Sequence, residues 1–429
     1  MREMKDSGIE WIGEIPKEWS VVKVKHLCKV TDGTHFSPQT TEVGKPYITV
    51  SNVNNSKIDI QGALTISEED FETLVKQGCQ PKIGDVLLSK DGTVGKTAVV
   101  MDDNAFVCLS SLGILSPCNY LYSSFLKYML DSILLQDQMI QAMAGSALRR
   151  ITISKINDFL ILLPAKTEQR VIADFLDTQC SEIDATAEDI QKEISLLEDY
   201  KKSLVYNVIS NGINHSIYST ENDEVWGNLP QGWKLVDIKY LFEIVKRIAG
   251  KEGYDVLSVT QKGLKIKDIT SGDGQLADNY CGYQFVYPTD YVMNHMDLLT
   301  GWVDCSELFG VTSPDYRVFR LIDRSAHNLV YYKYVMQCCY MNKIFYSLGQ
   351  GVSNLGRWRL QTSSFNNFKV PVPPKDEQDE IADYLDTKCS EIDSLIADKK
   401  RQLDILANYK KSLIYEYVTG KKEVPVKDF

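Results

Sequence analysis

Residues 164–190 read PAKTEQRVIADFLDTQCSEIDATAEDI, and residues 373–399 read PPKDEQDEIADYLDTKCSEIDSLIADK. The second stretch begins 209 positions after the first (373 minus 164), and residues 200–204, YKKSL, return at the same shift as residues 409–413. Chance does not produce a match of this length, so the chain contains an internal repeat.

A weaker match opens each half, at Ile15-Pro16-Lys17-Glu18-Trp19 and at Leu229-Pro230-Gln231-Gly232-Trp233. Between the matched ends the two halves differ in sequence, but the order of their predicted elements is the same. A Tyr-rich helical stretch and then a glycine-led basic loop precede each long repeated segment. The 429-residue chain therefore predicts two domains that share a frame and differ in content.

The repeated segments have the hydrophobic spacing of long helices. Apolar residues recur at alternating steps of four and three, which is the pattern of a coiled-coil seam. The expected seam residues are Leu176, Ile183, Ile190, Ile194, Leu197, Leu204, Leu385, Ile392, Ile396, Leu403, Leu406 and Leu413. About forty residues at 1.5 Å each make a helix of about 60 Å.

Such a seam needs a partner, and each copy of the segment can supply one for the other. We therefore expect the two helices to form an antiparallel coiled coil, although Lys399 and Lys410 of the second copy fall on the seam and leave its register open. The alternative is that each helix packs as an ordinary core helix on its own domain.

Residues 89–97, SKDGTVGKT, end like a phosphate-binding loop. The first glycine of that motif is replaced by Lys90, and a β-branched run rather than a helix follows Thr97, which argues against nucleotide binding. The stretch is better interpreted as a β-hairpin with residues 90–96 at its tip. Such a tip is either purely structural or presents Lys90, Thr93 and Lys96 to a polyanion.

Other features of the sequence argue against an enzyme and against a metal centre. Ser313-Pro314-Asp315-Tyr316 resembles a methyltransferase loop, but no glycine-rich cofactor loop precedes it, and no nuclease-type carboxylate and lysine follow. The ten Cys form no Cys-x-x-Cys pair, so no zinc site or disulfide framework is indicated, and a reducing cytoplasm fits. We expect no catalytic residue, no metal ligand, no secretory signal and no membrane span.

Composition predicts that any DNA contact is local or shared with a partner. The net charge of −11 argues against a protein that coats nucleic acid by bulk electrostatics. Basic residues do gather in the two glycine-led loops, with Arg149 and Arg150 in the first half and Arg357 and Arg359 in the second. Arginine suits bidentate contact with guanine or phosphate, so these residues are candidate DNA contacts, whereas the alternative is that they are solvated loop charges.

Two differing domains joined by long helices resemble the specificity subunit of type I restriction-modification systems. The resemblance covers nearly the whole chain. It rests on residues 15–19, on residues 84–96 (GDVLLSKDGTVGK), and above all on residues 164–177 with their second copy.

The resemblance implies an α+β fold in which two mixed α/β target recognition domains are separated by two long helices, with a pseudo-two-fold internal repeat. The domain bounds expected on this basis are 1–162 and 213–371 for the recognition domains, 163–212 and 372–422 for the spacer helices, and 423–429 for the tail.

The resemblance also implies a function. Each domain would read one half of a bipartite, asymmetric site on double-stranded DNA, and the helices would act as a ruler. Two modification subunits would supply the S-adenosylmethionine chemistry, and restriction subunits would supply ATP-driven translocation and Mg-dependent cleavage, so this chain itself would need no cofactor. The alternatives are a two-domain protein scaffold and a free-standing bipartite DNA-binding regulator.

Overall fold

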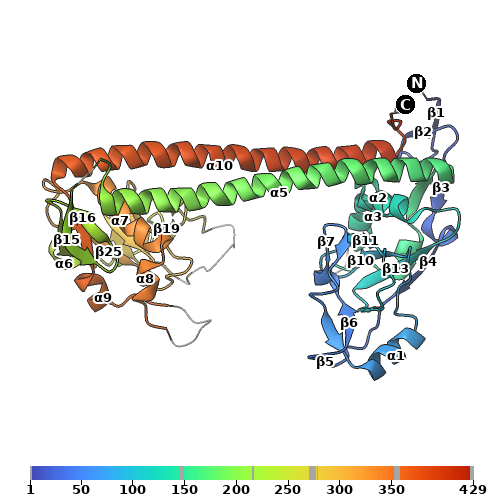
Figure 1. The fold of residues 1–429 in the computed structure, drawn as a ribbon, viewed down its shortest axis with the longest axis horizontal. Helices are drawn as coiled ribbons and strands as arrows, with labels where there is room; N and C mark the ends of the chain where they lie inside the picture. Colours follow the sequence, from blue (N-terminus) through green and yellow to red (C-terminus); the bar gives the residue numbers. More distant parts are fainter. Residues whose placement is uncertain are drawn as a thin grey trace. The chain divides into compact units, whose positions relative to one another are not determined.

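The computed structural model describes residues 2–144, 149–214, 217–269, 277, 279–351 and 358–425. The chain forms two compact units. The first unit contains residues 1–190 and 401–429, and the second contains residues 191–400. Two long helices, α5 (Lys166–Asn211) and α10 (Lys375–Val418), contribute residues to both units (Figure 1).

The first unit is built on a four-stranded antiparallel sheet with the strand order β11-β10-β13-β4. Its members are β4 (Cys28–Asp32), β10 (Val86–Ser89), β11 (Thr97–Val99) and β13 (Leu112–Pro117). All four residues of β10 are buried, because this strand lies inside the sheet and is rich in Val and Leu. The sheet therefore holds one end of the β10–β11 hairpin rigidly.

Smaller elements complete the first unit. A second four-stranded sheet has the order β12-β6-β9-β5. Its members, the other strands and the helices are β1 (Met4–Asp6), β2 (Glu14–Pro16), β3 (Ser20–Lys23), β5 (Thr40–Thr41), β6 (Lys45–Ile48), β7 (Val53–Asn54), β8 (Lys57–Ile58), β9 (Leu64–Ile66), β12 (Val107–Cys108), β14 (Leu160–Leu163), α1 (Glu68–Lys76), α2 (Ser123–Asp131), α3 (Ile133–Met143) and α4 (Ile153–Asn157). Strand β14 pairs with β3 and leads directly into α5.

The second unit repeats the first sheet. Its four-stranded antiparallel sheet has the order β23-β22-β25-β18, which matches β11-β10-β13-β4 strand for strand. Its members are β18 (Phe242–Val245), β22 (Tyr291–Met293), β23 (Val303–Cys305) and β25 (Arg317–Leu321). The shared frame that the sequence predicts is thus present in both units.

Most of the remaining elements of the second unit differ from those of the first. Two-stranded sheets take the place of the second four-stranded sheet. The elements are β15 (Tyr218–Asp223), β16 (Gly227–Pro230), β17 (Lys234–Asp237), β19 (Leu257–Thr260), β20 (Gly263–Ile266), β21 (Gln284–Val286), β24 (Gly310–Thr312), β26 (Lys369–Val372), α6 (Ile238–Leu241), α7 (Leu329–Met341), α8 (Ile344–Ser347) and α9 (Thr362–Asn367). The pairing of β17 with β26 repeats that of β3 with β14.

Local sequence explains the ends of the two long helices. A proline precedes each helix: Pro374 lies directly before α10, and Pro164 lies two residues before α5. The first helix stops at Gly212, whose φ of 70° is the left-handed conformation that ends many helices. Between these signals, α5 has 46 residues and α10 has 44.

The two helices run antiparallel within each unit. In the first unit Phe175 contacts Tyr417 and Asp184 pairs with Lys410, so the partner number falls as the number along α5 rises. In the second unit Glu193 pairs with Lys399 and Lys201 with Asp393, and the order is the same. The predicted antiparallel pairing and internal repeat are confirmed.

Each helix also packs into the core of one unit. Leu176 and Cys180 of α5 belong to the main hydrophobic cluster of the first unit, and Leu385 and Cys389 of α10 belong to that of the second. The first part of each helix therefore serves as a core helix as well as a partner for the other helix. The two packing modes that the sequence left open as alternatives occur together.

Candidate nucleic-acid interface

The repeated Glu168-Gln169 and Glu377-Gln378 pairs fasten each domain to its long helix. In the first unit the Trp19 indole Nε1 donates a hydrogen bond to Glu168 Oε2 at 3.0 Å. In the second unit Trp233 Nε1 donates to Glu377 Oε2 at 2.9 Å. These contacts explain why the weak repeat at the start of each half and the strong repeat at its end occur together.

The glutamine of each pair binds the loop before a short helix. Gln169 Oε1 accepts a hydrogen bond from the Tyr122 amide at 2.8 Å, and its Nε2 donates to the Pro164 carbonyl at 2.9 Å. Gln378 repeats both contacts, with the Asn328 amide at 2.9 Å and the Pro373 carbonyl at 2.9 Å. Because both glutamines are buried, these hydrogen bonds fix where α2 and α7 begin.

A tyrosine on each of these short helices binds the same aspartate of the repeat. Tyr128 donates its hydroxyl to Asp177 Oδ1 at 2.7 Å, and Tyr334 donates to Asp386 Oδ1 at 2.7 Å. Burial, followed by the hydrogen bond to the aspartate, raises the pKa of both tyrosines. The hydrogen bonds that hold the short helix of each unit on its long helix are therefore equivalent in the two units.

The predicted β-hairpin is confirmed. Strands β10 and β11 pair antiparallel, and residues 90–96 form the tip. Ser89 closes this tip, because its hydroxyl donates to the Thr93 carbonyl at 2.6 Å and accepts from the Lys96 amide at 2.7 Å. A strand follows Thr97 where a phosphate-binding loop would continue as a helix, so the stretch is not a nucleotide site.

The first basic loop lies against this hairpin tip. The Ile151 amide donates to the Lys90 carbonyl at 2.8 Å, and the Gly92 amide donates to the Arg149 carbonyl at 3.2 Å. Arg150 Nε lies 3.6 Å from Asp91 Oδ2. Arg149 and Arg150 are both exposed, so this loop presents two guanidinium groups to solvent beside the hairpin tip.

One expected contact residue needs correction. Lys90 is only 1% exposed, and its Nζ lies 3.4 Å from Asp32 Oδ2 on β4. A buried ammonium requires a counter-charge, and Asp32 supplies it. Lys90 therefore does not present its charge at the hairpin tip, and only Thr93, which is exposed, and the half-buried Lys96 remain there.

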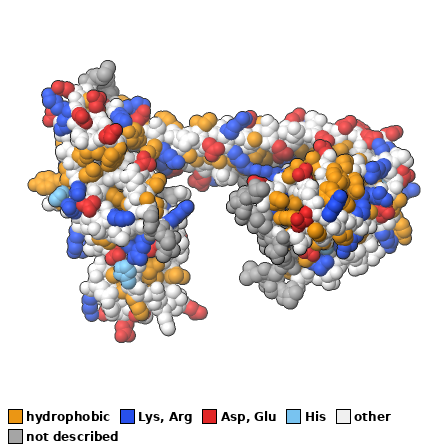
Figure 2. Space-filling model, turned by 180° about the vertical axis from the view of Figure 1, so that it is seen from behind, with side chains coloured by type: hydrophobic (Ala, Val, Ile, Leu, Met, Phe, Trp, Pro, Cys, Tyr) orange, Lys and Arg blue, Asp and Glu red, His pale blue; other side chains and the backbone are white. Residues whose placement is uncertain are grey.

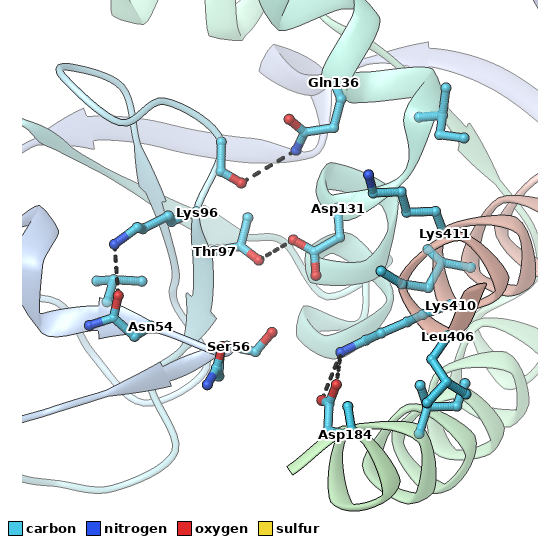
Figure 3. A pocket seen from close by; sticks show the side chains of 18 of the residues that line it. Asn54, Ser56, Lys96, Thr97, Asp131, Gln136, Asp184, Leu406, Lys410 and Lys411 are labelled. Carbon is cyan, nitrogen blue, oxygen red and sulfur yellow. Dashed lines mark hydrogen bonds and ion pairs between the residues drawn. The ribbon is translucent and has the colours of Figure 1, made fainter. Parts of the chain in front are cut away.

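Lys96 faces a cleft of about 750 Å³ in the first unit (Figure 3). Its Nζ donates to Asn54 Oδ1 at 2.7 Å, while Asp131 and the Asp184–Lys410 pair line the cleft farther from the tip. Burial raises the pKa of the Asp131 carboxyl, although the Lys127 ammonium at 3.2 Å opposes the shift. The cleft thus lies between the hairpin tip and the helix pair, and both positive and negative side chains line it.

The second unit brings the corresponding segments together in the same way. The loop between β22 and β23 matches the first hairpin tip, and the Leu360 amide donates to the His295 carbonyl at 3.0 Å, as Ile151 does to Lys90. Arg359 is exposed and forms a backbone bridge with Gln350. Arg357, the other predicted contact in this loop, lies outside the described residues.

The structure places every expected seam residue at a covered position. Seven are buried, namely Leu176, Ile190, Ile194, Leu385, Ile392, Ile396 and Leu413. The others are half-buried, namely Ile183, Leu197, Leu204, Leu403 and Leu406. The seam lysines are accommodated because each forms an ion pair with an acid on the opposite helix, Lys399 with Glu193 and Lys410 with Asp184.

Sequence reasoning missed a repeated surface feature of the helices. Leu196 and Tyr200 lie one turn apart on α5 and are each more than half exposed. The repeat carries them onto Ile405 and Tyr409 of α10, which are exposed to the same degree. The shift of 209 was visible at Tyr200, but exposure could not be derived from it; hydrophobic side chains on the helix surface are visible in Figure 2.

Further functional features would be metal ligands, reactive thiols or membrane-spanning helices. Within the described part of the chain no three His, Cys, Asp or Glu side chains gather as a metal site. Burial raises the pKa of the repeated Cys180 and Cys389 thiols, which pack as small apolar side chains. In that same part of the chain, none of the helices combines the length and the apolar character needed to cross a membrane.

The chain thus contains one α/β domain frame twice, and each copy is fastened to a long helix by the same Trp-Glu and Gln contacts. The family model for the type I restriction modification DNA specificity domain matches residues 16–196 and again residues 230–404. The chain belongs to this family and carries two such DNA specificity domains.

Relatives with known names agree with this assignment. The putative type I restriction enzyme MjaX specificity subunit of Methanocaldococcus jannaschii is 24% identical over 433 residues, which covers 96% of each chain. The EcoKI specificity subunit of Escherichia coli K12 is 22% identical and covers 49% of this chain and 49% of its own.

A solved structure has the same fold. It comes from work on complex assembly and conformational transition of the type I R-M system, with a TM-score of 0.67, 15% identity and coverage of 95% of this chain and 99% of that one.

Proposed function

We propose that this chain is the DNA-reading subunit of a type I restriction-modification complex, in which each domain reads one half of a bipartite, asymmetric site. The observation that carries the proposal is the repeated frame with different contents. Both units keep the four-stranded sheet, the strand pair beside the long helix and the Glu-Gln attachment, whereas two-stranded sheets in the second unit take the place of the first unit's second four-stranded sheet. Two copies of one frame with different surfaces suit two different half-sites on one duplex.

The exposed guanidinium groups beside each hairpin are the proposed DNA contacts. In the first unit these are Arg149 and Arg150, with Thr93 and Lys96 at the hairpin tip, and in the second unit Arg359 takes the corresponding place. Arginine can bind guanine or a phosphate with two parallel hydrogen bonds. A local basic edge of this kind reconciles DNA binding with the net charge of −11.

The two long helices are the proposed ruler and the proposed docking surface. A continuous helix of 46 residues is about 70 Å long, which is about twice the 34 Å of one turn of B-DNA. The Leu196–Tyr200 surface on α5 recurs as the Ile405–Tyr409 surface on α10. Two equivalent apolar surfaces suit two copies of the same partner, and we assign them to two modification subunits.

Catalysis is assigned to those partners. The modification subunits would hold S-adenosylmethionine, and restriction subunits would hold ATP and Mg for translocation and cleavage. This chain would work in the cytoplasm as a non-catalytic subunit. A protein scaffold and a free-standing regulator remain the alternatives, because the same two-domain arrangement can bring together two proteins or bind DNA without a methyltransferase.

Co-expression with the modification subunit tests the proposal. The expected product is a complex of one specificity chain with two modification subunits that methylates a bipartite site, measured by mass and by methylome sequencing. Changing Leu196 and Tyr200 together to Asp should release one modification subunit, and the same change at Ile405 and Tyr409 should release the other. Leu395→Asp is the control, because Leu395 is exposed but the repeat places Thr186 at its counterpart position.

Each alternative predicts a different product. A chain that binds one duplex sequence specifically without any modification subunit is a regulator. A chain that binds no DNA, either alone or with the modification subunit, at low or at raised salt concentration, is a scaffold.

A further inference from the structure

Corresponding positions of the two four-stranded antiparallel sheets, one in each unit, carry side chains of opposite charge. In the first unit the buried Lys90 and Asp32 form a pair, with Nζ 3.4 Å from Oδ2. Strand register identifies the counterparts in the second unit: Leu88 faces Gly113 as Met293 faces Arg317. Two residues beyond these strand positions, Lys90 corresponds to His295, and their carbonyls accept equivalent hydrogen bonds from Ile151 and Leu360.

The counterpart of Asp32 is Lys246. Asp32 lies opposite Gly113 on β4, and continuation of the β18–β25 register one residue beyond Val245 places Lys246 opposite Arg317. An acid in the first unit is therefore replaced by a base in the second. Lys246 is exposed, and among the described residues no carboxylate lies within ion-pair distance of it.

Arg317 is a buried cation at this place. It is 4% exposed, and its Nη2 donates to the Leu360 carbonyl at 3.1 Å and to Thr362 Oγ1 at 3.3 Å. In the described part of the second unit it forms no ion pair with a carboxylate. Burial lowers the pKa of Arg317 to about 10, and the neighbouring Arg359 acts in the same direction, so the guanidinium is still charged at pH 7.

Unsatisfied polar atoms lie in the same segment. His295 is 7% exposed, and its Nδ1 has no hydrogen-bond partner among the described residues. The Trp358 indole Nε1, one residue from Arg359, is also buried without a partner there. Buried polar groups are rarely left unpaired, and a buried guanidinium without a carboxylate partner among the described residues, beside two unpaired polar atoms, indicates a place for an anion.

We propose that Arg317, Arg359 and Lys246 form an anion site in the second domain that binds a phosphate of the DNA backbone. In the described part of the first domain Asp32 neutralises the corresponding buried lysine, so we expect no equivalent site there. The proposal rests on the DNA-reading function proposed above and adds that the two domains bind DNA with unequal electrostatic contributions. A phosphate supplies the negative charge that this place lacks among the described residues.

The test uses the complex of this chain with its modification subunits and a duplex that carries its methylated site. Lys246→Asp places a carboxylate at the register position of Asp32, and Arg359→Gln removes the exposed guanidinium. Both residues are exposed, so folding should survive, which circular dichroism checks. Lys5→Asp, at an exposed lysine of β1, is the charge-matched control.

We expect each of the two variants to weaken binding to all sequences several-fold and to lower the slope of log affinity against log salt concentration by about one. A duplex with neutral methylphosphonates along the second half-site should reproduce the loss in the unaltered complex. It should cause no further loss in the variants.

Variants that match Lys5→Asp in affinity and salt slope would overturn the site, and so would methylphosphonate losses that simply add to those of the variants. The proposed function fails separately, when the unaltered complex does not prefer its own site over a scrambled duplex.

Discussion

Lys410 of α10 lies across the helix pair from Asp184 of α5, with its Nζ 2.6 Å from Oδ1. The repeat carries Lys410 back onto Lys201 and Asp184 onto Asp393, and these two residues form the same pair, with Nζ 2.7 Å from Oδ1. A single contact therefore occurs twice, once in each unit, as expected when two similar helices pair antiparallel. The lysines that interrupt the apolar seam thus specify its direction and register.

Charge exchange tests this register. Asp184→Lys should place two lysines face to face, whereas Asp184→Lys combined with Lys410→Asp should restore the attraction. Because the pair is half-exposed, the coupling free energy should be modest, about 0.5–1 kcal/mol. A double-mutant cycle on chemical unfolding measures it, and the Lys201–Asp393 pair provides the matched second cycle. Absence of recovery in both exchanged variants would contradict the antiparallel register.

Lengthening both helices should lengthen the DNA spacer. One heptad inserted after Ile190 in α5 and one after Lys400 in α10 keeps the seam on the same face and adds about 10 Å to each helix. At 3.4 Å per base pair this moves one domain by about three base pairs. Methylome sequencing should report unchanged half-sites separated by a longer spacer. Altered half-site bases with unaltered spacing would show that the helices are not the ruler.

Each buried glutamine should stabilise only its own domain. Gln169→Ala leaves the Tyr122 amide and the carbonyls of Tyr120 and Pro164 without their partner, which should cost about 2–4 kcal/mol. Gln378→Ala should have a similar effect on the second domain. Limited proteolysis with mass spectrometry should locate the first cuts in the altered domain only. Cuts spread equally over both domains would contradict independent attachment.

The sequence predicted most of this fold for a definite reason. Residues 164–190 recur because each copy must meet the other helix, a Trp indole and a buried loop, and those constraints repeat with the frame. The antiparallel direction followed from the repeat alone. The register did not, since it depends on ion pairs between residues that are distant in the chain.

The site was harder to predict. Lys90 looked like a surface cation in a glycine-rich turn, and only tertiary structure brings Asp32 of another strand to 3.4 Å from it. No local sequence pattern pointed to Arg317 and His295, because they are brought near each other only by pairing of strands more than twenty residues apart in the chain. Charges placed by long-range pairing cannot be derived from periodicity or motif.

The second domain should become less stable in acid because of His295. Burial, together with Arg317 and Arg359, lowers the pKa of His295 to about 3, whereas the unfolded side chain titrates near 6.5. The unfolded state therefore binds more protons between these values, so stability is complete above pH 6.5 and declines as the pH falls towards 3. At pH 5 the loss should be about 1–2 kcal/mol. His295→Gln should remove this part of the pH dependence, which chemical unfolding at a series of pH values measures.

The exposed arginines beside the hairpins should separate base reading from phosphate binding. Arg149 lies in the first domain and Arg359 in the second, and the backbone of each basic loop is hydrogen-bonded to a hairpin tip. An arginine that reads a base should, when changed to Ala, cost about 1–3 kcal/mol on the cognate site and relax the preference at one position. An arginine that binds phosphate should weaken binding to every sequence and lower the salt slope by about one.

The anion site proposed above predicts that Arg359 binds phosphate. Arg149 is expected to read a base instead, because Asp32 neutralises the buried Lys90 of its domain. Methylation of the cognate site and of single-base variants by the assembled complex distinguishes the two classes for Arg149→Ala and Arg359→Ala. If both variants keep the affinity, preference and salt slope of the unaltered complex, the DNA lies against another face of these domains. If Arg149→Ala relaxes one base position while Arg359→Ala changes only the salt slope, the two domains grip DNA by different means on the same frame.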